Sequence, residues 1–390
     1  MTVPEDDILA SYQVVEIAST CAGAFAGRLL AEAGLSVLRL EVEAVPMMVN
    51  MPPFAPDGRS IAWLSANAKK AVLRVDARSQ RALIERLIAQ SEVFITDAPD
   101  WQEARARGVT CHIDPWEGVV AADAGLPSVD VLTQALCGAV SVTGRLTGPP
   151  VAIGFPVGDV APGIYATIAV LNGLLEGTPQ QVAIRGLDAA VSLLSYMGCC
   201  FKVDGEDIGF IGSGHPYIVP YGAFSASDGY VIVAAFTQVF WRKLCTLLQR
   251  EDLAATARFR TFSDRRDSRE ELNKLINDLF SEHTVAYWME QLRAGDVPHA
   301  PVLSVRQAID QSAVAEREMV IDLDGLRLLN SPVIDMVRRA AGASTRPAVV
   351  RDGRAALGRL GLDARTIEAL LGDGVLAVFD GAPAALTSTA

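Results

Sequence analysis

The sequence predicts an α/β protein with a Rossmann-like large domain and a smaller α+β domain. Two observations lead to this fold class. Short apolar strands alternate with helical patterns over the first third of the chain, an order typical of a parallel sheet covered by helices. The chain also has 390 residues, which is more than one small hydrophobic core usually holds together.

The first third supplies the strands and helices of the large domain. One helix is expected over residues 22–33, where Gly34 ends it, and another after Ser79, which is placed to cap it. Leu83 and Leu87 belong to the apolar stripe of this second helix. No GxGxxG motif is present, so the Rossmann-like assignment depends on the order of strands and helices. The predicted strands are residues 14–18, 37–40, 71–75 and 93–95.

The smaller domain is expected where glycines cluster, between residues 205 and 214. Aromatic and branched residues follow, and the pair Asp228-Gly229 predicts the turn of a β-hairpin. Helical patterns come next, and Ser268 with Glu271 predicts a capping box at the start of one of them. Together these patterns predict an α+β unit.

Composition excludes several classes of protein. Half of the residues are hydrophobic, which is enough for a full core and excludes disorder for most of the chain. The net charge of −12 argues against a nucleic-acid partner. No signal peptide or apolar run of about 20 residues is apparent, so we expect a cytoplasmic protein with no membrane partner. The six cysteines and four histidines lack metal-ligand spacing, so free thiols and no metal site are expected.

The loop of residues 154–163 places a single acid, Asp159, between small residues just before an apolar helix. Two interpretations are open. Asp159 is a good N-cap, because a carboxylate favours the positive end of a helix. It also suits a carboxylate at the mouth of a pocket, where it attacks an activated acyl group. The two roles are compatible, since helix-end amides would hold the carboxylate in place.

Two further motifs also allow two interpretations each. His215 follows the run Gly212-Ser213-Gly214, which suits either a mobile flap or a simple turn. Lys70 and the lysine before it precede a strand, and they suit either a solvated surface or a phosphate contact.

Several motifs, in order, resemble those of the class III CoA-transferases, the CaiB/BaiF family that includes formyl-CoA transferases and α-methylacyl-CoA racemases. The resemblance extends over nearly the whole chain, to about Val375, and several motifs in order are more specific than any one of them. The matching segments are residues 14–17, 22–34, 67–76, 141–144, 149–150, 156–159, 215–216 and 220–224.

The resemblance implies the domain organisation. Members of the family build their large Rossmann-type domain from both ends of the chain, and two subunits interlock as a homodimer. On this basis residues 1–204 begin the large domain, residues 205–310 form the small domain with its linkers, and residues 311–390 return to the large domain.

The resemblance also implies an acyl-CoA:carboxylate CoA-transferase. Asp159 stands at the position of the family's nucleophile, which forms an aspartyl-acyl anhydride and then an aspartyl-CoA thioester. The substrates are an acyl-CoA and a carboxylic acid, with coenzyme A as substrate and no permanently bound cofactor. Backbone N–H groups at Gly212 and Gly214 are candidate donors to the oxyanions. The candidates for holding CoA are Cys21, Ala22, Gly23, Arg39, Lys70 and Thr96.

The sequence departs from the family where CoA is held. Glu41 is followed by Val42 and another acid where the family has a basic residue, and residues 96–100 replace the family's turn that borders the CoA nucleotide. These departures keep open a diverged member with weak or lost activity, acting as a partner subunit or scaffold. Acyl-CoA racemase or isomerase chemistry is disfavoured, because Val129 stands where racemases have a histidine.

Overall fold

The chain folds into two compact units. The first, here the large unit, comprises Met1–Cys137, Gly154–Ser195 and Ser312–Ala390, and the second, the small unit, comprises Gly138–Ile153 and Tyr196–Gln311. The expected boundaries at 204/205 and 310/311 differ from this division, which also assigns Gly138–Ile153 to the small unit. The computed structural model describes residues 13–42, 47–56, 58–78, 80–114, 116, 129–144, 147–204, 209–323, 326–333, 358, 362–372 and 376–378.

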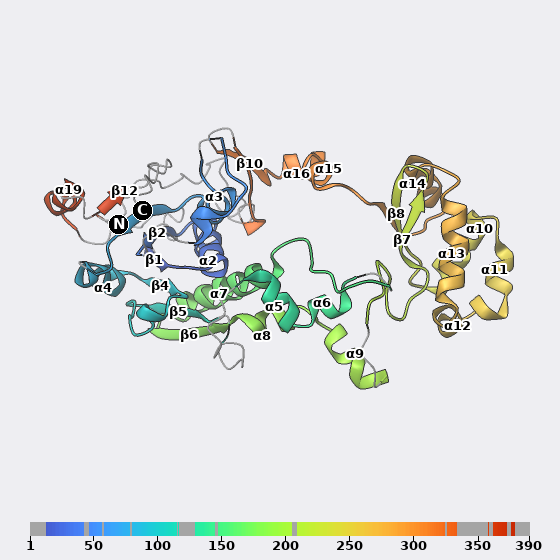
Figure 1. The fold of residues 1–390 in the computed structure, drawn as a ribbon, viewed down its shortest axis with the longest axis horizontal. Coiled ribbons are helices and arrows are strands. Elements are labelled where there is room, and N and C mark those ends of the chain that lie inside the picture. The colour runs from blue at the N-terminus through green and yellow to red at the C-terminus, as the bar shows by residue number, and fades with distance from the viewer. Residues whose placement is uncertain are drawn as a thin grey trace. The chain divides into compact units, whose positions relative to one another are not determined.

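A seven-stranded sheet forms the centre of the large unit (Figure 1). Its order is β12-β3-β2-β1-β4-β5-β6, and every pair is parallel except β12 with β3. The predicted α/β class and parallel sheet are therefore confirmed. The strands are β1 (Gln13–Ile17), β2 (Ser36–Glu41), β3 (Ala71–Val75), β4 (Val93–Thr96), β5 (Val109–Asp114), β6 (Gln180–Arg185) and β12 (Leu376–Val378).

Helices cover both faces of this sheet because its strands are apolar on both sides. Helices α2 (Cys21–Glu32) and α7 (Val157–Glu176) bury Leu30 and Val170 against one face. Helices α4 (Arg81–Gln90) and α19 (Ala364–Gly372) bury Ile84 and Ile367 against the other. The remaining elements of the large unit are η2 (Met47–Asn50), α3 (Ile61–Asn67), η3 (Pro99–Trp101), α5 (Asp130–Leu136), α8 (Gly186–Ser192), α16 (Ser312–Glu316), β10 (Val320–Leu323) and β11 (Leu326–Leu329).

Helix α7 is, within the described part of the chain, the helix with the length and apolar composition of a membrane span. It also packs against α2 and buries Ala161, Ala166 and Val170 in the core. A buried core helix meets the same criteria of length and composition, so this feature is weak evidence for a membrane partner.

The small unit has an antiparallel sheet of β7 (Tyr221–Ala226), β8 (Gly229–Ala234) and β9 (His299–Pro301). Its register pairs Ala226 with Gly229, which confirms the predicted hairpin. The turn is Ser227-Asp228, one residue earlier than predicted, because Gly229 is the first residue of β8. The predicted capping box at Ser268 is wrong, since that side chain makes no cap hydrogen bond. Its helices are α6 (Ala139–Val142), α9 (Met197–Asp204), α10 (Gln238–Leu247), α11 (Glu251–Ala255), η5 (Ala257–Phe259), α12 (Phe262–Asp267), α13 (Arg269–Phe280), α14 (Val285–Ala294) and α15 (Val305–Ile309).

Candidate active site

The order of the strands reverses beside β1, which lies between β2 and β4. From β1 the chain first extends the sheet through β2 and β3, and then returns to add β4 on the other side. In open parallel sheets, ligands bind outside the carboxyl ends of the strands at such a reversal. The loops after β1 and β4 therefore frame the candidate site.

Asp97 connects these two loops. Its Oδ1 accepts hydrogen bonds from Ser19 N (2.6 Å) and Oγ (2.8 Å), and its Oδ2 accepts them from Thr20 N (3.0 Å) and Oγ1 (2.5 Å). Burial raises the pKa of the Asp97 carboxyl, and the hydrogen bonds from Thr20 and Ser19 oppose that rise. The carboxylate lies where the dipole of α2 favours an anion. The fold thus supplies its own anion at the start of α2.

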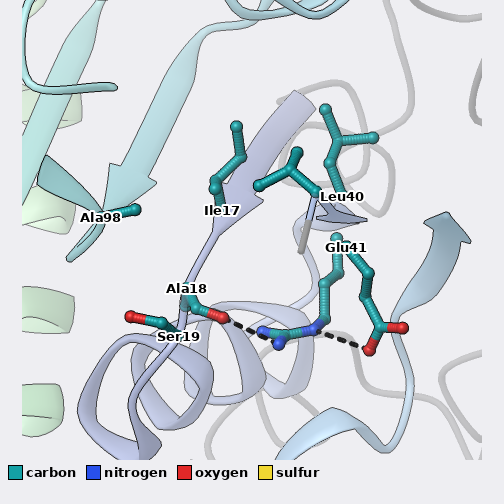
Figure 2. Close-up of a pocket in the computed structure, with 8 residues that line it drawn as sticks. Ile17, Ala18, Ser19, Leu40, Glu41 and Ala98 are labelled. Atoms are coloured by element: carbon teal, nitrogen blue, oxygen red, sulfur yellow. Dashed lines mark hydrogen bonds and ion pairs between the residues drawn. The ribbon is translucent and has the colours of Figure 1, made fainter. Parts of the chain in front are cut away.

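A small pocket opens beside this loop, at the ends of β1 and β2. Ala98 and Ser19 lie on one side of it and Glu41 on the other (Figure 2). Arg39 also lines the pocket, but it is only 1% exposed. Its two terminal nitrogens donate to Glu16 Oε1 (2.5 Å) and Ala18 O (2.8 Å). Its Nε has no hydrogen bond but forms an ion pair with Glu41 Oε1 at 3.6 Å.

Lys70 lies in the same buried network. Its Nζ donates to Glu16 Oε2 (2.7 Å), Ala24 O (2.6 Å) and Asn67 Oδ1 (3.0 Å). These three hydrogen bonds use every N–H of the ammonium group. Burial lowers the pKa of Lys70 to about 8, and Glu16 opposes this shift. The expected phosphate contact of Lys70 therefore finds no support in this geometry.

Asp159 lies in the first turn of α7, and it is not the N-cap. Pro156 holds the N-cap position, with no side-chain cap hydrogen bond. Instead Asp130, on α5, accepts a hydrogen bond from Gly158 N (2.7 Å) and a second from Gln134 Nε2 (2.7 Å). The N-cap interpretation of Asp159 is therefore wrong. Because Asp130 holds the start of α7, the carboxylate of Asp159 is left for another role.

Asp159 is partly buried, and a second acid, Asp130, acts on its charge. Burial raises the pKa of Asp159 to about 6, the charge of Asp130 adds to the rise, and a hydrogen bond with the Cys21 thiol opposes it. Burial also raises the pKa of Cys21 to about 12, with Asp159 as the next cause. At neutral pH the thiol therefore stays protonated and weakly nucleophilic, whereas the carboxylate is ionised. Of these two groups, the Asp159 carboxylate is therefore the one that is ionised at neutral pH.

The structure brings part of the predicted site together. Cys21 lies beside Asp159, and Ala22 and Gly23 are buried in the same first turn of α2. Thr96 is buried at the end of β4, where its hydroxyl accepts a hydrogen bond from Ala98 N (3.0 Å).

Gly212 and Gly214 belong to the small unit. Gly212 N donates to Gly144 O (3.0 Å), and Gly214 N donates to Ile211 O (3.2 Å). Both N–H groups are therefore used within that unit, and the expected contacts with a substrate oxyanion find no support.

Comparison with known proteins decides the family. The model of CoA-transferase family III matches residues 9–359. The chain belongs to CoA-transferase family III. It is therefore an enzyme of the CoA-transferase class, as the motifs in the sequence predict.

Relatives named as CoA-transferases are similar to most of the chain. A succinyl-CoA:mesaconate CoA-transferase of Haloarcula hispanica is 29% identical, over 81% of this chain and 85% of that protein. A human succinyl-CoA:glutarate CoA-transferase is 24% identical, over 81% of this chain and 76% of that protein. The crystal structure of a CaiB/BaiF family protein from Brucella suis matches with a TM-score of 0.72 at 26% identity, over 83% of this chain and 92% of that chain.

Sequence reasoning missed two acids that organise this family III site. Asp97 and Asp130 each hold the start of a helix, α2 and α7 respectively, from a neighbouring element. Neither stands next in sequence to the helix that it holds, so local capping rules do not find them. The signal available was indirect: Pro156, which cannot donate or cap, stands where α7 needs a partner.

Proposed function

We propose that the protein is an acyl-CoA:carboxylate CoA-transferase in which Asp159 carries the acyl group and then CoA. Family membership and the named relatives support the reaction class. One observation carries the mechanism. The carboxylate of Asp159 is partly buried, does not cap α7, and lies at the strand reversal where parallel sheets bind ligands.

The reaction proceeds by four acyl transfers. The Asp159 carboxylate attacks the acyl-CoA carbonyl and expels CoA thiolate, which gives a mixed anhydride. The thiolate attacks the aspartyl carbonyl and releases the donor acid, leaving an aspartyl-CoA thioester. The acceptor carboxylate then attacks this thioester, which forms a second anhydride and frees the thiolate again. Attack of the thiolate on the acceptor's acyl carbon gives the new acyl-CoA and restores Asp159.

The pKa of Asp159 fits this nucleophilic role. With a pKa of about 6 the carboxylate is ionised at neutral pH, yet burial makes it more basic than an ordinary aspartate. Cys21 is beside it as a neutral thiol. The acids named for the relatives, succinate, mesaconate and glutarate, make short dicarboxylic acids the first substrates to test.

Trapping of the intermediate tests the proposal. The protein is incubated with succinyl-CoA and hydroxylamine, and peptides are then analysed by mass spectrometry. An aspartyl hydroxamate at Asp159 is expected, and Asp159→Ala should lower kcat by more than about 10³-fold. The matched control is Asp130→Asn, which keeps the acceptor for Gly158 N and should keep the adduct. No adduct with any of a panel of acyl-CoAs, together with full activity of Asp159→Ala, would falsify the mechanism.

Binding of CoA separates this proposal from a scaffold that has lost activity. Arg39 and Lys70 are occupied by Glu16, so CoA must be held by groups other than their paired N–H donors. Calorimetry with CoA should still give micromolar affinity. No heat of binding at millimolar CoA would favour the scaffold.

We also propose a cytoplasmic homodimer, as the family resemblance implies. Apolar side chains on α5, α7 and the loop before α7 are exposed in the single chain, and burial against a second copy would remove them from water. Light scattering that gives a monomer at micromolar concentration would contradict it. The exposed side chains are Val131, Leu136, Phe155, Ile164, Tyr165 and Ile168.

A further inference from the structure

We propose that the large unit has a second small-molecule site, at the amino ends of β5 and β6, which binds a carboxylate-bearing ligand through Arg105, Thr110 and Gln181. This site lies apart from Asp159, and its existence does not depend on the proposed function. A cavity and the hydrogen-bond donors around it support the site.

One face of the central sheet changes from apolar to polar toward β6, the strand at its edge (Figure 1). On β4 this face carries Phe94, which packs in the apolar core with α4. The register places Thr110 of β5 beside Phe94, and Gln181 of β6 beside Thr110. Residues 181, 183 and 185 of β6 are exposed. Because paired residues share a face, the polar part of this face lies on β5 and β6.

A cavity of about 330 Å³ lies at the start of these two strands. This volume is within the range of about 300–1,000 Å³ that is typical of small-molecule sites. The cavity is lined by the loop before β5 (Arg105, Ala106 and Gly108), by Thr110, and by residues 179–181 at the start of β6.

Hydrogen bonds hold the loop before β5 in place. Ala106 N donates to Thr110 Oγ1 (3.0 Å). Gln180 N donates to Gly108 O (3.0 Å), which connects the loop to β6. A Cβ on Gly108 would lie 2.6 Å from Glu92 O, so the loop also passes close to the backbone before β4. The cavity is therefore formed by fixed backbone and needs no ordering of the loop when a ligand binds.

The side chains of Thr110 and Gln181 supply hydrogen-bond donors. Thr110 is only 1% exposed, and its hydroxyl oxygen accepts the hydrogen bond from Ala106 N. No residue that the structure describes accepts the hydroxyl proton of Thr110. Gln181 is exposed and adds an amide NH₂ group. A ligand with acceptor oxygens would satisfy both groups.

Arg105 supplies the positive charge. Its Nη1 donates to Gln102 O and to Ala104 O (2.8 Å), which fixes the guanidinium group against its own loop. Its Nη2 forms an ion pair of 3.6 Å with Glu103, whose side chain is 99% exposed. An exposed ion pair of this length is weak, so Nε and Nη2 can donate to an anion.

His112 adds a buried polar group beside the cavity. It follows Thr110 by two residues on β5, so both side chains lie on the same face. Its two ring nitrogens are buried and have no hydrogen-bond partner among the described residues, although buried polar groups are normally paired. Burial lowers the pKa of His112, and the charge of Arg105 lowers it further, which places that charge near the ring.

The surrounding acids favour a carboxylate over a phosphate. Glu103 lies beside Arg105, and Glu176 Oε2 lies 3.3 Å from Gln180 Nε2. Repulsion by these acids is greater for a doubly charged phosphate than for a singly charged carboxylate group. We therefore assign the site to a small carboxylic acid.

Helix α7 separates this site from the candidate active site. Asp159 is in its first turn, whereas a Cβ on Gly173 would lie 2.7 Å from Val109 Cγ2 and 3.0 Å from Gln180 Nε2. Residues 159 to 173 of a helix span about 21 Å at about 1.5 Å per residue. A short dicarboxylic acid cannot extend over this distance, so one molecule cannot occupy both sites.

Nuclear magnetic resonance of the histidine rings tests the proposal without any turnover. The chain has four histidines, and His112→Gln identifies the His112 signal by its loss. Glutarate is titrated into the full chain at constant ionic strength. We expect a saturable change in the chemical shift of His112. Arg105→Gln should raise the apparent Kd by at least about tenfold, the loss expected for hydrogen bonds to a charged group.

The control variants show where glutarate binds. Arg107→Gln is the matched control, because Arg107 lies in the same loop but pairs with Glu92, and it should keep the wild-type titration. Asp159→Ala should also keep it. Gln181→Ala, at an exposed position, should weaken binding and serves as a second variant if Arg105→Gln lowers Tm.

Four results would overturn the proposal. The first is a His112 signal that does not respond to glutarate, and the second is an equal response in wild type, Arg105→Gln and Gln181→Ala. The third is loss of the response in Asp159→Ala, which would assign it to the candidate active site. The fourth is tighter binding of inorganic phosphate than of glutarate, which would contradict the carboxylate assignment.

Discussion

The starts of α2 and α7 lie in the same unit, and the aspartates beside them, Asp97 and Asp159, have different hydrogen-bond partners. At α2, Asp97 accepts four hydrogen bonds from Ser19 and Thr20, so both oxygens of its carboxylate are used in structural hydrogen bonds. At α7, Asp159 accepts none from the backbone of its helix, because Asp130 holds that end from α5. Residue type and burial are alike, and it is the partners that differ.

The difference shows how the carboxylate that we propose as the nucleophile is kept out of the helix cap. A carboxylate near a helix start normally gains stability by capping it. Here a second acid, Asp130, takes that role. Burial raises the pKa of Asp159, and the negative charge of Asp130 adds to the rise. In the proposed mechanism, Asp130 thus stabilises the helix start and Asp159 reacts with the substrate.

The largest expected effect on stability comes from removing the carboxylate of Asp97. Asp97→Ala leaves the N–H groups of Ser19 and Thr20 without their acceptor in a partly buried loop, which should lower the free energy of unfolding by roughly 3 kcal/mol. Urea unfolding measures this. Asp100→Ala, at an exposed position of the next turn, is the control and should change little. Equal decreases in the free energy of unfolding for the two variants would show that the hydrogen bonds of Asp97 do not stabilise the fold.

Gly158→Ala should separate geometry from charge at α7. A Cβ there would lie 2.8 Å from Thr133 Cβ and 2.9 Å from Asp130 O, so the start of α7 must move. Displacement of Asp159 by a fraction of an ångström to 1 Å should lower kcat by up to roughly 100-fold. Gly154→Ala, in the preceding loop, meets nothing within 4 Å and should keep full activity. A fully active Gly158→Ala enzyme contradicts the placement of Asp159.

Asp159→Asn should stabilise the protein, in contrast to Asp97→Ala. With its pKa raised from 3.8 to about 6, the folded carboxyl holds its proton more tightly than the unfolded one. Stability therefore falls as pH rises from about 4 to 6, and the cost is fully present above pH 6. Removing it should add about 1 kcal/mol at pH 7, or a few degrees in Tm, and less as pH falls toward 4. A constant difference at every pH would contradict this cause.

The smallest expected effect is that of Asp130→Asn on the pH profile. Asparagine keeps an oxygen for Gly158 N but removes the charge that raises the pKa of Asp159. The acid limb of kcat/KM should therefore move below pH 6 by roughly half a pH unit. Rates measured from pH 5 to 8 give the midpoint. An unmoved midpoint with reduced kcat would leave Asp130 as a purely structural cap.

Most of the large unit could be predicted, because its strands and helices follow local patterns. The predicted strand at residues 71–75 matches β3, and the helix predicted over residues 22–33 matches α2 within a residue at each end. Ser79, the predicted cap of α4, lies outside the described residues, and Gln80 is the N-cap. Capping boxes lie at Thr261 with Asp264 and at Ser304 with Gln307, and there is none at Ser268.

The candidate site was predicted only in part. The family motif identified Asp159, and helix α2 brings Cys21 beside it. The burial of Arg39 and Lys70 could not be predicted. The sequence does not tell whether a basic side chain binds a phosphate or forms a buried ion pair, as both residues do with Glu16. Gly27 is the residue that indicates this burial. A Cβ at Gly27 would lie 1.7 Å from Glu16 Oε2, so α2 passes directly over the Glu16 carboxylate.

The pairing of β12 with β3 has a consequence for the order of folding during synthesis. Residues 362–378 contribute Leu362 and Ile367 to the core under α4, and β12 extends the sheet beside β3. The core and sheet of the large unit therefore cannot be completed until these residues are synthesised, more than 50 positions after the small unit ends at Gln311. Domains that are complete earlier fold earlier on the ribosome. A nascent chain stalled near residue 350 should protect the small unit from protease and leave the large unit open to cleavage.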